Sequence, residues 1–133
     1  MKFAVYLWAA PASLIGLLLA ASLLFGRGRM RWHSGVLEVC GGLPGWLLSR
    51  RLPFSGPVAA ITLGHVVLAC NQPALDATRR HERVHVAQYA RWGGLLLIAY
   101  PLAGGWAWMR GKHPYLDNPF EIEARRLDAV GRK

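Results

Sequence analysis

Two long stretches without a charged residue constrain most strongly how this chain of 133 residues can fold. The first runs from Phe3 to Phe25, and the second runs from Trp92 to Met109. A straight helix of about 20 apolar residues crosses the hydrocarbon core of a bilayer, which is about 30 Å thick. Because the first stretch is long enough to do so, it predicts a transmembrane helix over residues 1–26.

A cleaved secretory signal peptide is the alternative interpretation of residues 1–26, because Lys2 precedes the apolar run and small residues occur late in it. The apolar part of a signal peptide is usually only about 7 to 15 residues long, so we expect an uncleaved, single-pass anchor. Three arginines follow the anchor, at Arg27, Arg29 and Arg31. Positive residues favour the cytoplasmic side of a membrane, so we expect residues 27–133 to lie there as a single domain.

The charge of the chain limits its partners. Lysine and arginine number 16 against 7 aspartate and glutamate, which gives a formal net charge of +9, although 53% of the residues are hydrophobic. Such an apolar composition argues against a disordered chain. The basic residues are spread along the sequence without the pattern of a nucleic-acid-binding module, so we expect membrane lipids with anionic headgroups, and no nucleic acid, as partners.

The remaining pattern predicts an α+β fold with short antiparallel strands. Residues Gly35–Val39 and Val58–Ala69 are rich in branched residues and bounded by turn formers, as strands are. A helix is expected from an N-cap at Asp76 to Trp92, where two glycines follow. Another helix is expected over residues 118–129, with proline in its first turn and glutamates near its N-terminus.

The middle helix contains the sequence HERVH at residues 81–85. His81 and His85 are four residues apart, so both imidazoles project from one helix face and can bind one Zn²⁺. Glu82 lies beside such a metal without binding it and can accept a proton from water. A catalytic zinc usually has three protein ligands, so a third ligand is expected on another element, and Glu121 on the last helix is a candidate.

This metal site restricts the second uncharged stretch. If residues 92–109 formed a straight helix through the membrane, His85 and Glu121 would lie on opposite sides of the bilayer. The stretch must therefore fold back near Pro101 or Gly104. We expect an interfacial helical hairpin there, in addition to the single transmembrane helix.

The segments HERVHVAQY and NPFEIEA together resemble the gluzincin-type HExxH zinc metallopeptidases, and in size the small bacterial members with a minimal catalytic domain. The resemblance covers about half of the chain and implies a zincin-like core that binds Zn²⁺. It implies that Glu121, three residues before Ala124, is the third metal ligand, with Glu123 as the second choice. It also implies that Glu82 is the general base, in a protein of the bacterial inner membrane.

In these families an upper strand pairs with the extended substrate, and the strand within residues 58–69 is placed to do this. His65 on that strand is then a catalytic candidate that stabilises the developing oxyanion. A structural role is the alternative for His65. Tyr89 and Tyr115 are further candidates as hydrogen-bond donors to the intermediate.

Two positions depart from the family pattern. Arg83 follows the motif glutamate, where an uncharged residue is usual, and its charge is expected to face lipid headgroups. Arg125 stands where an acid often orients a motif histidine. That role would then fall to Asp128, Asp117 or a backbone carbonyl.

These patterns predict a membrane-anchored, zinc-dependent peptidase that hydrolyses peptide or protein substrates. One alternative is a catalytically inactive, zincin-like membrane protein that only binds partners, which the replacement of an acid by Arg125 favours. A second alternative is a structural membrane protein with accidental motifs. It requires the three proposed ligands to lie more than about 10 Å apart, well beyond any shared coordination sphere.

Overall fold

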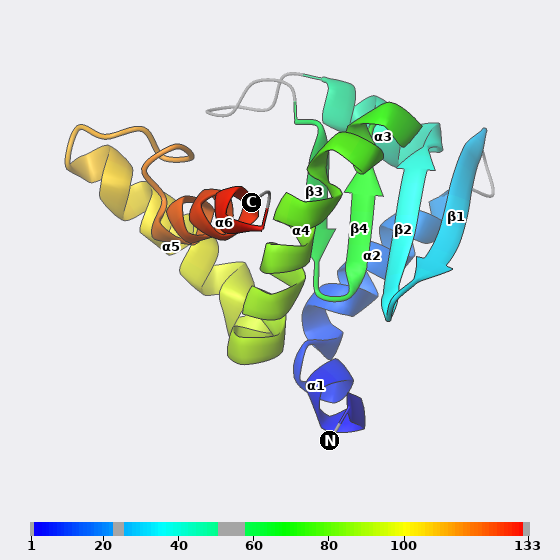
Figure 1. Ribbon diagram of the computed structural model, residues 1–133, viewed down its shortest axis with the longest axis horizontal. Helices are drawn as coiled ribbons and strands as arrows, with labels where there is room; N and C mark the ends of the chain where they lie inside the picture. Colours follow the sequence, from blue (N-terminus) through cyan, green and yellow to red (C-terminus); the bar gives the residue numbers. More distant parts are fainter. Residues whose placement is uncertain (1, 23–25, 51–57, 132–133) are drawn as a thin grey trace.

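A computed structural model describes residues 2–22, 26–50 and 58–131, which form a four-stranded mixed sheet with helices on both faces (Figure 1). In order along the chain, the elements are α1 (Lys2–Trp8), α2 (Ala10–Ala21), β1 (Gly28–His33), β2 (Val36–Gly41), α3 (Gly42–Ser49), β3 (Ala60–Leu63), β4 (Val66–Ala69), α4 (Gln72–Trp92), the 3-10 turn η2 (Gly93–Leu95), α5 (Leu96–Met109) and α6 (Pro119–Val130). The strand order is β1-β2-β4-β3.

The sheet is mixed, whereas the sequence analysis predicted antiparallel strands. The pairs β1–β2 and β3–β4 are antiparallel, but β2 and β4 run parallel, with Leu37 opposite Val66. The predicted strand over residues 58–69 is a hairpin, because Gly64 adopts a φ of 65° and reverses the chain between β3 and β4. Strand β1 was not predicted, because three arginines close together after an apolar stretch are typical of a basic flank, although they alternate with Met30 and Trp32 as in a strand.

Each face of the sheet buries a separate apolar cluster. Val39, Val66 and Leu68 pack on one face against Ala20 of α2 and Leu48 of α3. The opposite face packs against α4 through a cluster made of Val36, Cys40, Val67, Ala69 and Leu75. Helix α4 is thereby fixed on the sheet by side chains from both central strands.

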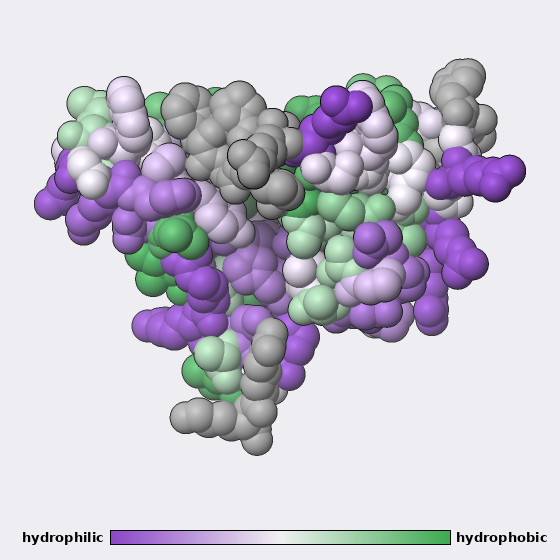
Figure 2. Space-filling model, turned by 90° about the horizontal axis from the view of Figure 1, so that it is seen from above, coloured by the Kyte–Doolittle hydropathy of each residue, from purple (hydrophilic) through white to green (hydrophobic). Residues whose placement is uncertain are grey.

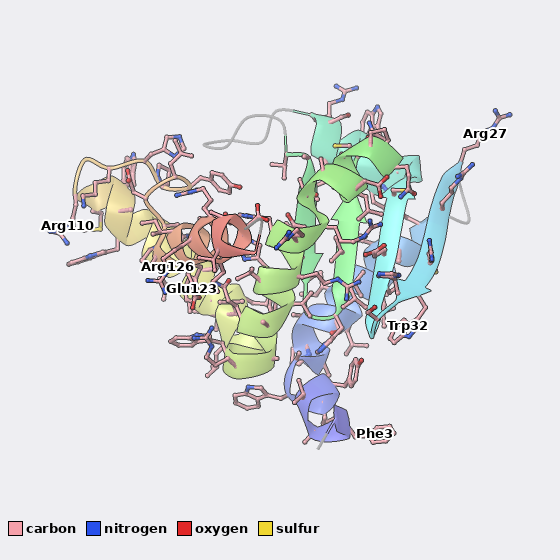
Figure 3. The ribbon with its side chains drawn as sticks, in the orientation of Figure 1. Phe3, Arg27, Trp32, Arg110, Glu123 and Arg126 are labelled. Carbon is pink, nitrogen blue, oxygen red and sulfur yellow. The ribbon has the colours of Figure 1, made fainter. Side chains whose placement is uncertain are left out.

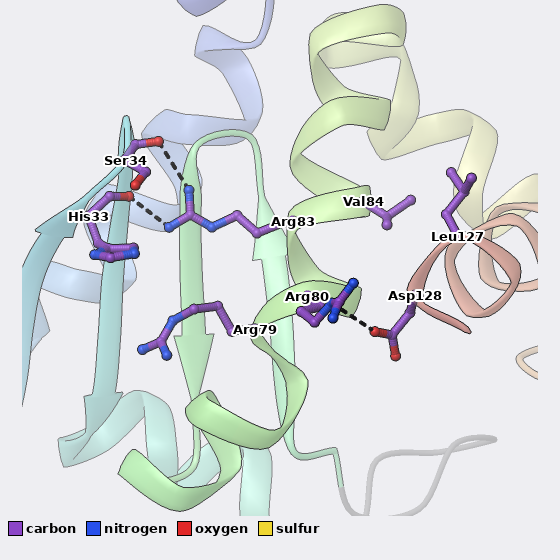
Figure 4. A pocket seen from close by; sticks show the side chains of 8 residues that line it. All are labelled: His33, Ser34, Arg79, Arg80, Arg83, Val84, Leu127 and Asp128. Carbon is purple, nitrogen blue, oxygen red and sulfur yellow. Dashed lines mark hydrogen bonds and ion pairs between the residues drawn. The ribbon is translucent and has the colours of Figure 1, made fainter. Parts of the chain in front are cut away.

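A buried ion-pair network also fixes α4. Glu38 of β2 is 3% exposed and accepts two hydrogen bonds from Arg79, at 2.9 and 3.1 Å, and one from Arg83, at 3.1 Å. Burial alone would raise the pKa of Glu38, but the two guanidinium groups outweigh it and lower that pKa. Arg83 also donates to the carbonyl groups of His33 and Ser34, where β1 turns into β2 (Figure 4).

The predicted membrane anchor is wrong for the described residues. The apolar stretch divides into α1 and α2, which are only about 10 and 18 Å long, and residues 23–25 lie outside the described part. No described helix combines the length and hydropathy that crossing a bilayer requires. Helix α2 packs on the sheet, and Gly16 lies so close to Val66 that an added Cβ would be 2.7 Å from its Cβ.

The predicted interfacial hairpin is also wrong, because α5 continues from Leu96 to Met109 through Pro101 and Gly104. Gly104 does not break the helix. Its missing side chain lets the returning loop approach, since a Cβ there would lie 2.8 Å from the carbonyl oxygen of Pro114. The chain instead reverses after α5, where Gly111 has a φ of 73°.

The two helices expected to hold the metal ligands are present. Helix α4 ends at Trp92 as predicted, but Asn71, not Asp76, is its N-cap and accepts a hydrogen bond from the amide of Ala74 at 2.9 Å. Helix α6 begins at Pro119, close to the predicted start at residue 118, and Asn118 is its N-cap. Asn118 also donates to the carbonyl of Tyr100 at 3.0 Å, which ties the start of α6 to α5.

The Glu38 network predicts an acid-dependent contribution to stability. Replacing Glu38 with Gln should lower the free energy of unfolding at pH 7 by about 1–3 kcal/mol, because the charged hydrogen bonds are lost. The folded-state pKa of Glu38 lies below its ordinary value of 4.5, so this stabilisation is present above pH 4.5 and is lost as the pH falls through the folded-state pKa. Urea unfolding in the presence of chelator at several pH values measures the difference.

Asp76→Asn is the matched control, because Asp76 contacts the same Arg79 at 3.0 Å from a half-exposed position. It should change the free energy of unfolding by less than about 1 kcal/mol. A Glu38→Gln effect of equal size at pH 7 and pH 3 would contradict the role of the carboxylate charge.

Candidate metal centre

The two histidines of the HERVH segment lie on the same side of α4, and their rings are in contact. Their ring centroids are 4.8 Å apart, and the rings meet edge to face. The Nε2 atoms of His81 and His85 lie 3.1 Å from each other. His85 is buried, whereas His81 is partly exposed. The pair therefore presents two ring nitrogens to a single point next to the helix.

Glu121 brings a carboxylate to the same point from α6, which packs beside α4 and α5 (Figure 1). One carboxylate oxygen lies 3.1 Å from Nε2 of His81, and the other lies 3.2 Å from Nε2 of His85. Ligand atoms from these three residues all lie within 4.8 Å of one another. The structure thus brings together the three residues predicted as metal ligands, although they are separated by up to 40 positions in the sequence.

The spacing of these atoms fits a zinc ion. Zinc is bound at about 2.0–2.1 Å by imidazole nitrogen and carboxylate oxygen, so tetrahedral ligands lie about 3.3 Å from each other. The observed separations of 3.1 and 3.2 Å are close to that value. Two histidines and one glutamate leave one tetrahedral position open, as in catalytic zinc sites.

A hydrogen bond to Gln88 selects the form of His85 that can bind a metal. The Nδ1–H group of His85 donates to the amide oxygen of Gln88 at 2.9 Å, because the amide nitrogen of Gln88 itself donates to Phe120 and Glu123. With its proton on Nδ1, His85 keeps a lone pair on Nε2. Gln88 is fully buried and performs the orienting role that was expected of Asp117, Asp128 or a backbone carbonyl.

Glu123 supports the site from outside it. Its carboxylate accepts a hydrogen bond from Gln88 at 2.7 Å and another from Arg91 at 3.2 Å. These contacts lower the pKa of Glu123, with the bond from Gln88 as the main cause. Glu123 lies on α6 with Arg126 nearby (Figure 3). As the second choice for a ligand, it is two positions from Glu121 and belongs to the hydrogen-bond chain that ends at His85.

The electrostatics of the cluster favour a charged Glu121. Burial alone would raise the pKa of this carboxyl group, but hydrogen bonds from His81, His85 and Tyr100 hold it well below its usual range. Burial would also lower the pKa of His85, but the Glu121 carboxylate outweighs burial and raises it. The cluster is therefore a buried anion that attracts positive charge, either protons or a metal ion.

Tyr100 contacts the proposed ligand Glu121, and the sequence pattern did not predict this contact. Its hydroxyl donates to Glu121 at 2.6 Å from α5, and its burial and this carboxylate raise the pKa of the phenol. The bond fixes the orientation of Glu121. Tyr100 lies inside an uncharged stretch that was interpreted as interfacial, so only the fold places it at the cluster.

Glu82 lies outside the group of three ligands and is held by β3. It is 5% exposed, and the hydroxyl of Thr62 donates to its carboxylate at 2.7 Å. Burial, as the largest cause, raises the pKa of Glu82. A raised pKa suits a general base that exchanges protons near neutral pH. Thr62 was also missed, since nothing in a strand sequence distinguishes a threonine that contacts a distant carboxylate.

The structure does not bring His65 or Tyr89 to this cluster. His65 lies in the β3–β4 turn and packs on the ring of Tyr6, with centroids 4.2 Å apart. Among the described residues, no hydrogen bond or ring contact joins His65 to the cluster, and burial lowers its pKa, which favours a neutral ring. Tyr89 is 6% exposed and belongs to an apolar cluster with Ala9 and Leu96.

The two arginines that depart from the family pattern have structural contacts. Arg83 points from α4 to the β1–β2 turn and to Glu38, and not to lipid headgroups as expected. Arg125 donates to the carbonyl of Leu116 and so anchors the loop between α5 and α6. Neither side chain replaces a ligand.

Comparison with known proteins adds no relative: no family model, curated protein or solved structure matches this chain. The resemblance to zinc peptidases therefore depends on the residues of the cluster alone.

The geometry predicts one zinc ion per chain. The loss of a residue that only orients a metal ligand usually weakens metal binding by about 10 to 100-fold. His81→Ala and Glu121→Ala each remove a ligand itself, so each should weaken zinc binding by more than this. Equilibrium dialysis followed by metal analysis measures this. His65→Ala is the control, because it also removes a buried imidazole, and it should bind zinc like the wild type. Equal zinc affinity in His81→Ala and the wild type would contradict the site.

Proposed function

We propose that this protein is a zinc-dependent peptidase, with zinc held by His81, His85 and Glu121. The observation that supports this most is the convergence of these three ligand atoms beside a fourth side chain, Glu82, which is buried and fixed by Thr62. A purely structural zinc site would have no use for a buried carboxylate next to an incomplete ligand set.

In such a site, zinc polarises a carbonyl group and lowers the pKa of water so that it loses a proton near neutral pH. Two residues next to the ligands hold them in the orientation that metal binding requires. Gln88 keeps the lone pair of His85 free, and Tyr100 fixes the carboxylate of Glu121. The site therefore needs little rearrangement on binding metal.

Glu82 is the proposed general base. It accepts the proton of the attacking water and then gives it to the nitrogen of the leaving amine, so that its own charge is restored at the end of the reaction. The Thr62 hydroxyl donates to one carboxylate oxygen at 2.7 Å and limits the orientation of the group. The other oxygen is left to exchange the proton.

Strand β3 is the proposed binding edge for the substrate. It is the outermost strand on its side of the described sheet, and its only described strand partner is β4. An extended peptide can pair with the free edge by backbone hydrogen bonds. Because Thr62 of β3 touches Glu82, a peptide on this edge lies next to the general base.

Tyr115 is the proposed hydrogen-bond donor to the reacting carbonyl oxygen. It is 36% exposed, and burial together with the charge of Glu121 raises the pKa of its phenol to about 12. The phenol therefore keeps its proton at neutral pH and can donate it in a hydrogen bond. The other predicted donor, Tyr89, lies in the apolar core, and Tyr100, which the sequence did not indicate, donates to Glu121.

Glu82→Gln should lower peptide hydrolysis by about 100-fold or more, because the variant lacks the general base. It should still bind one zinc ion, since Glu82 is not a ligand. The measurement is the appearance of new termini by mass spectrometry in a mixed peptide library incubated with zinc-loaded protein. The isosteric amide keeps the hydrogen-bonding contact with Thr62, so the fold is expected to be retained.

Chelator should abolish the same cleavages, and restored zinc should recover them. Identical cleavage by wild type and Glu82→Gln would contradict the mechanism and indicate a contaminating protease. Zinc binding without any cleavage by the wild type would favour the alternative of a zincin-like binding protein.

A further inference from the structure

All six tryptophans of this chain are exposed at the surface. Their exposed fractions range from 42% for Trp92 to 63% for Trp108. The other four are Trp8, Trp32, Trp46 and Trp106. Tryptophan is on average a strongly buried residue, and it is enriched at protein interfaces and at the boundary between membrane and water. The distribution therefore indicates a partner surface.

Helices α1, α2 and α5 expose large apolar side chains. Helices α2 and α5 contain no charged residue, yet Leu18, Ile98 and Leu102 are exposed by 74, 61 and 66%. Helix α1 adds Phe3, which is 89% exposed and projects from the tip of the molecule (Figure 3). Soluble proteins rarely expose contiguous apolar patches larger than a few hundred Å².

These faces meet at one corner. Trp8 packs against Gly93 and Pro11 packs against Gly94, so the junction of α1 and α2 lies on the η2 turn that starts α5. From this corner α2 and α5 diverge (Figure 1). We call the exposed apolar side chains of α1, α2 and α5 the apolar surface.

Arginine accompanies tryptophan at each extremity of this surface. At the corner, the indole N–H of Trp8 donates to the backbone carbonyl of Arg91 at 3.4 Å, and the side chain of Arg91, which also contacts Glu123, is 59% exposed. At the far end of α5, the guanidinium of Arg110 lies 5.8 Å from the ring of Trp106. Beyond the end of α2, Arg50 lies 4.2 Å over Trp46 of α3.

This pattern fits a lipid surface better than a protein partner. Tryptophan rings lie at the level of lipid headgroups, and arginine beside them can contact phosphate groups. The net charge of +9 favours an anionic bilayer. On the face seen in Figure 2, hydrophobic side chains lie at the surface next to strongly hydrophilic ones.

We propose that the protein docks on the surface of an anionic lipid bilayer through the apolar surface, with the tryptophans of α1 and α5 at headgroup level and the flanking arginines on lipid phosphates. The proposal does not depend on peptidase activity. Ile98 and Leu102 lie on the opposite side of α5 from Tyr100, which contacts Glu121, so the docked protein keeps the metal centre away from the lipid.

The test is binding of the full chain to vesicles of phosphatidylcholine containing about one third phosphatidylglycerol. Sedimentation should show binding that weakens with added salt, because surface charges are screened. Tryptophan fluorescence should shift to shorter wavelength on binding. Leu102→Asp should weaken binding by about tenfold or more, since an exposed leucine no longer enters the lipid.

Val130→Asp on α6 is the matched control, because Val130 is 65% exposed, as Leu102 is, and lies outside the apolar surface. It introduces the same charge and should change binding by less than about twofold, since a single distant charge is largely screened. Equal loss of binding in the two variants would overturn the proposal. Failure to bind anionic vesicles, or a dimer in solution that buries the tryptophans and excludes lipid, would overturn it as well.

Discussion

The contact of Glu121 with His81 and His85 determines how the C-terminal helix α6 meets α4. It joins α6 to α4 across 40 positions of sequence, and it requires the chain between them to leave and return. Helix α5 provides the outward path, and Gly104 lets the returning loop pass close to it. A buried carboxylate is costly unless it is paired, so this arrangement is stable only where positive charge meets it.

The residues around the cluster form a continuous chain of directed hydrogen bonds. Arg91 donates to Glu123, Gln88 donates to Glu123, and His85 donates to Gln88. Each donor has one orientation that satisfies its neighbour, so the chain fixes the proton of His85 away from the metal position. On the other side, Thr62 of β3 holds Glu82, so the sheet and two helices each orient one part of the site.

The sequence was sufficient for the parts of the site that local spacing determines. The HERVH interval puts two imidazoles on one helix face, and Asn118 with proline after it marks the start of α6. The sequence was insufficient for residues whose role depends on long-range packing, such as Thr62, Gln88 and Tyr100. The long apolar stretches were misinterpreted for a physical reason, because burial against a sheet and burial in lipid select the same residues. For the first stretch, the division into two short helices and the close approach of Gly16 to Val66 distinguish the two kinds of burial.

The zinc K-edge absorption spectrum of the zinc-loaded protein is a direct test of metal binding by His81, His85 and Glu121, because it identifies the atoms bound to the metal. Binding by two imidazoles and one carboxylate predicts a fine structure with nitrogen and oxygen neighbours only, at about 2.0–2.1 Å, including the outer-shell pattern of two imidazole rings. A sulfur neighbour at about 2.3 Å would place the metal at Cys40 or Cys70, which are free thiols in this structure, and would contradict the assignment of His81, His85 and Glu121.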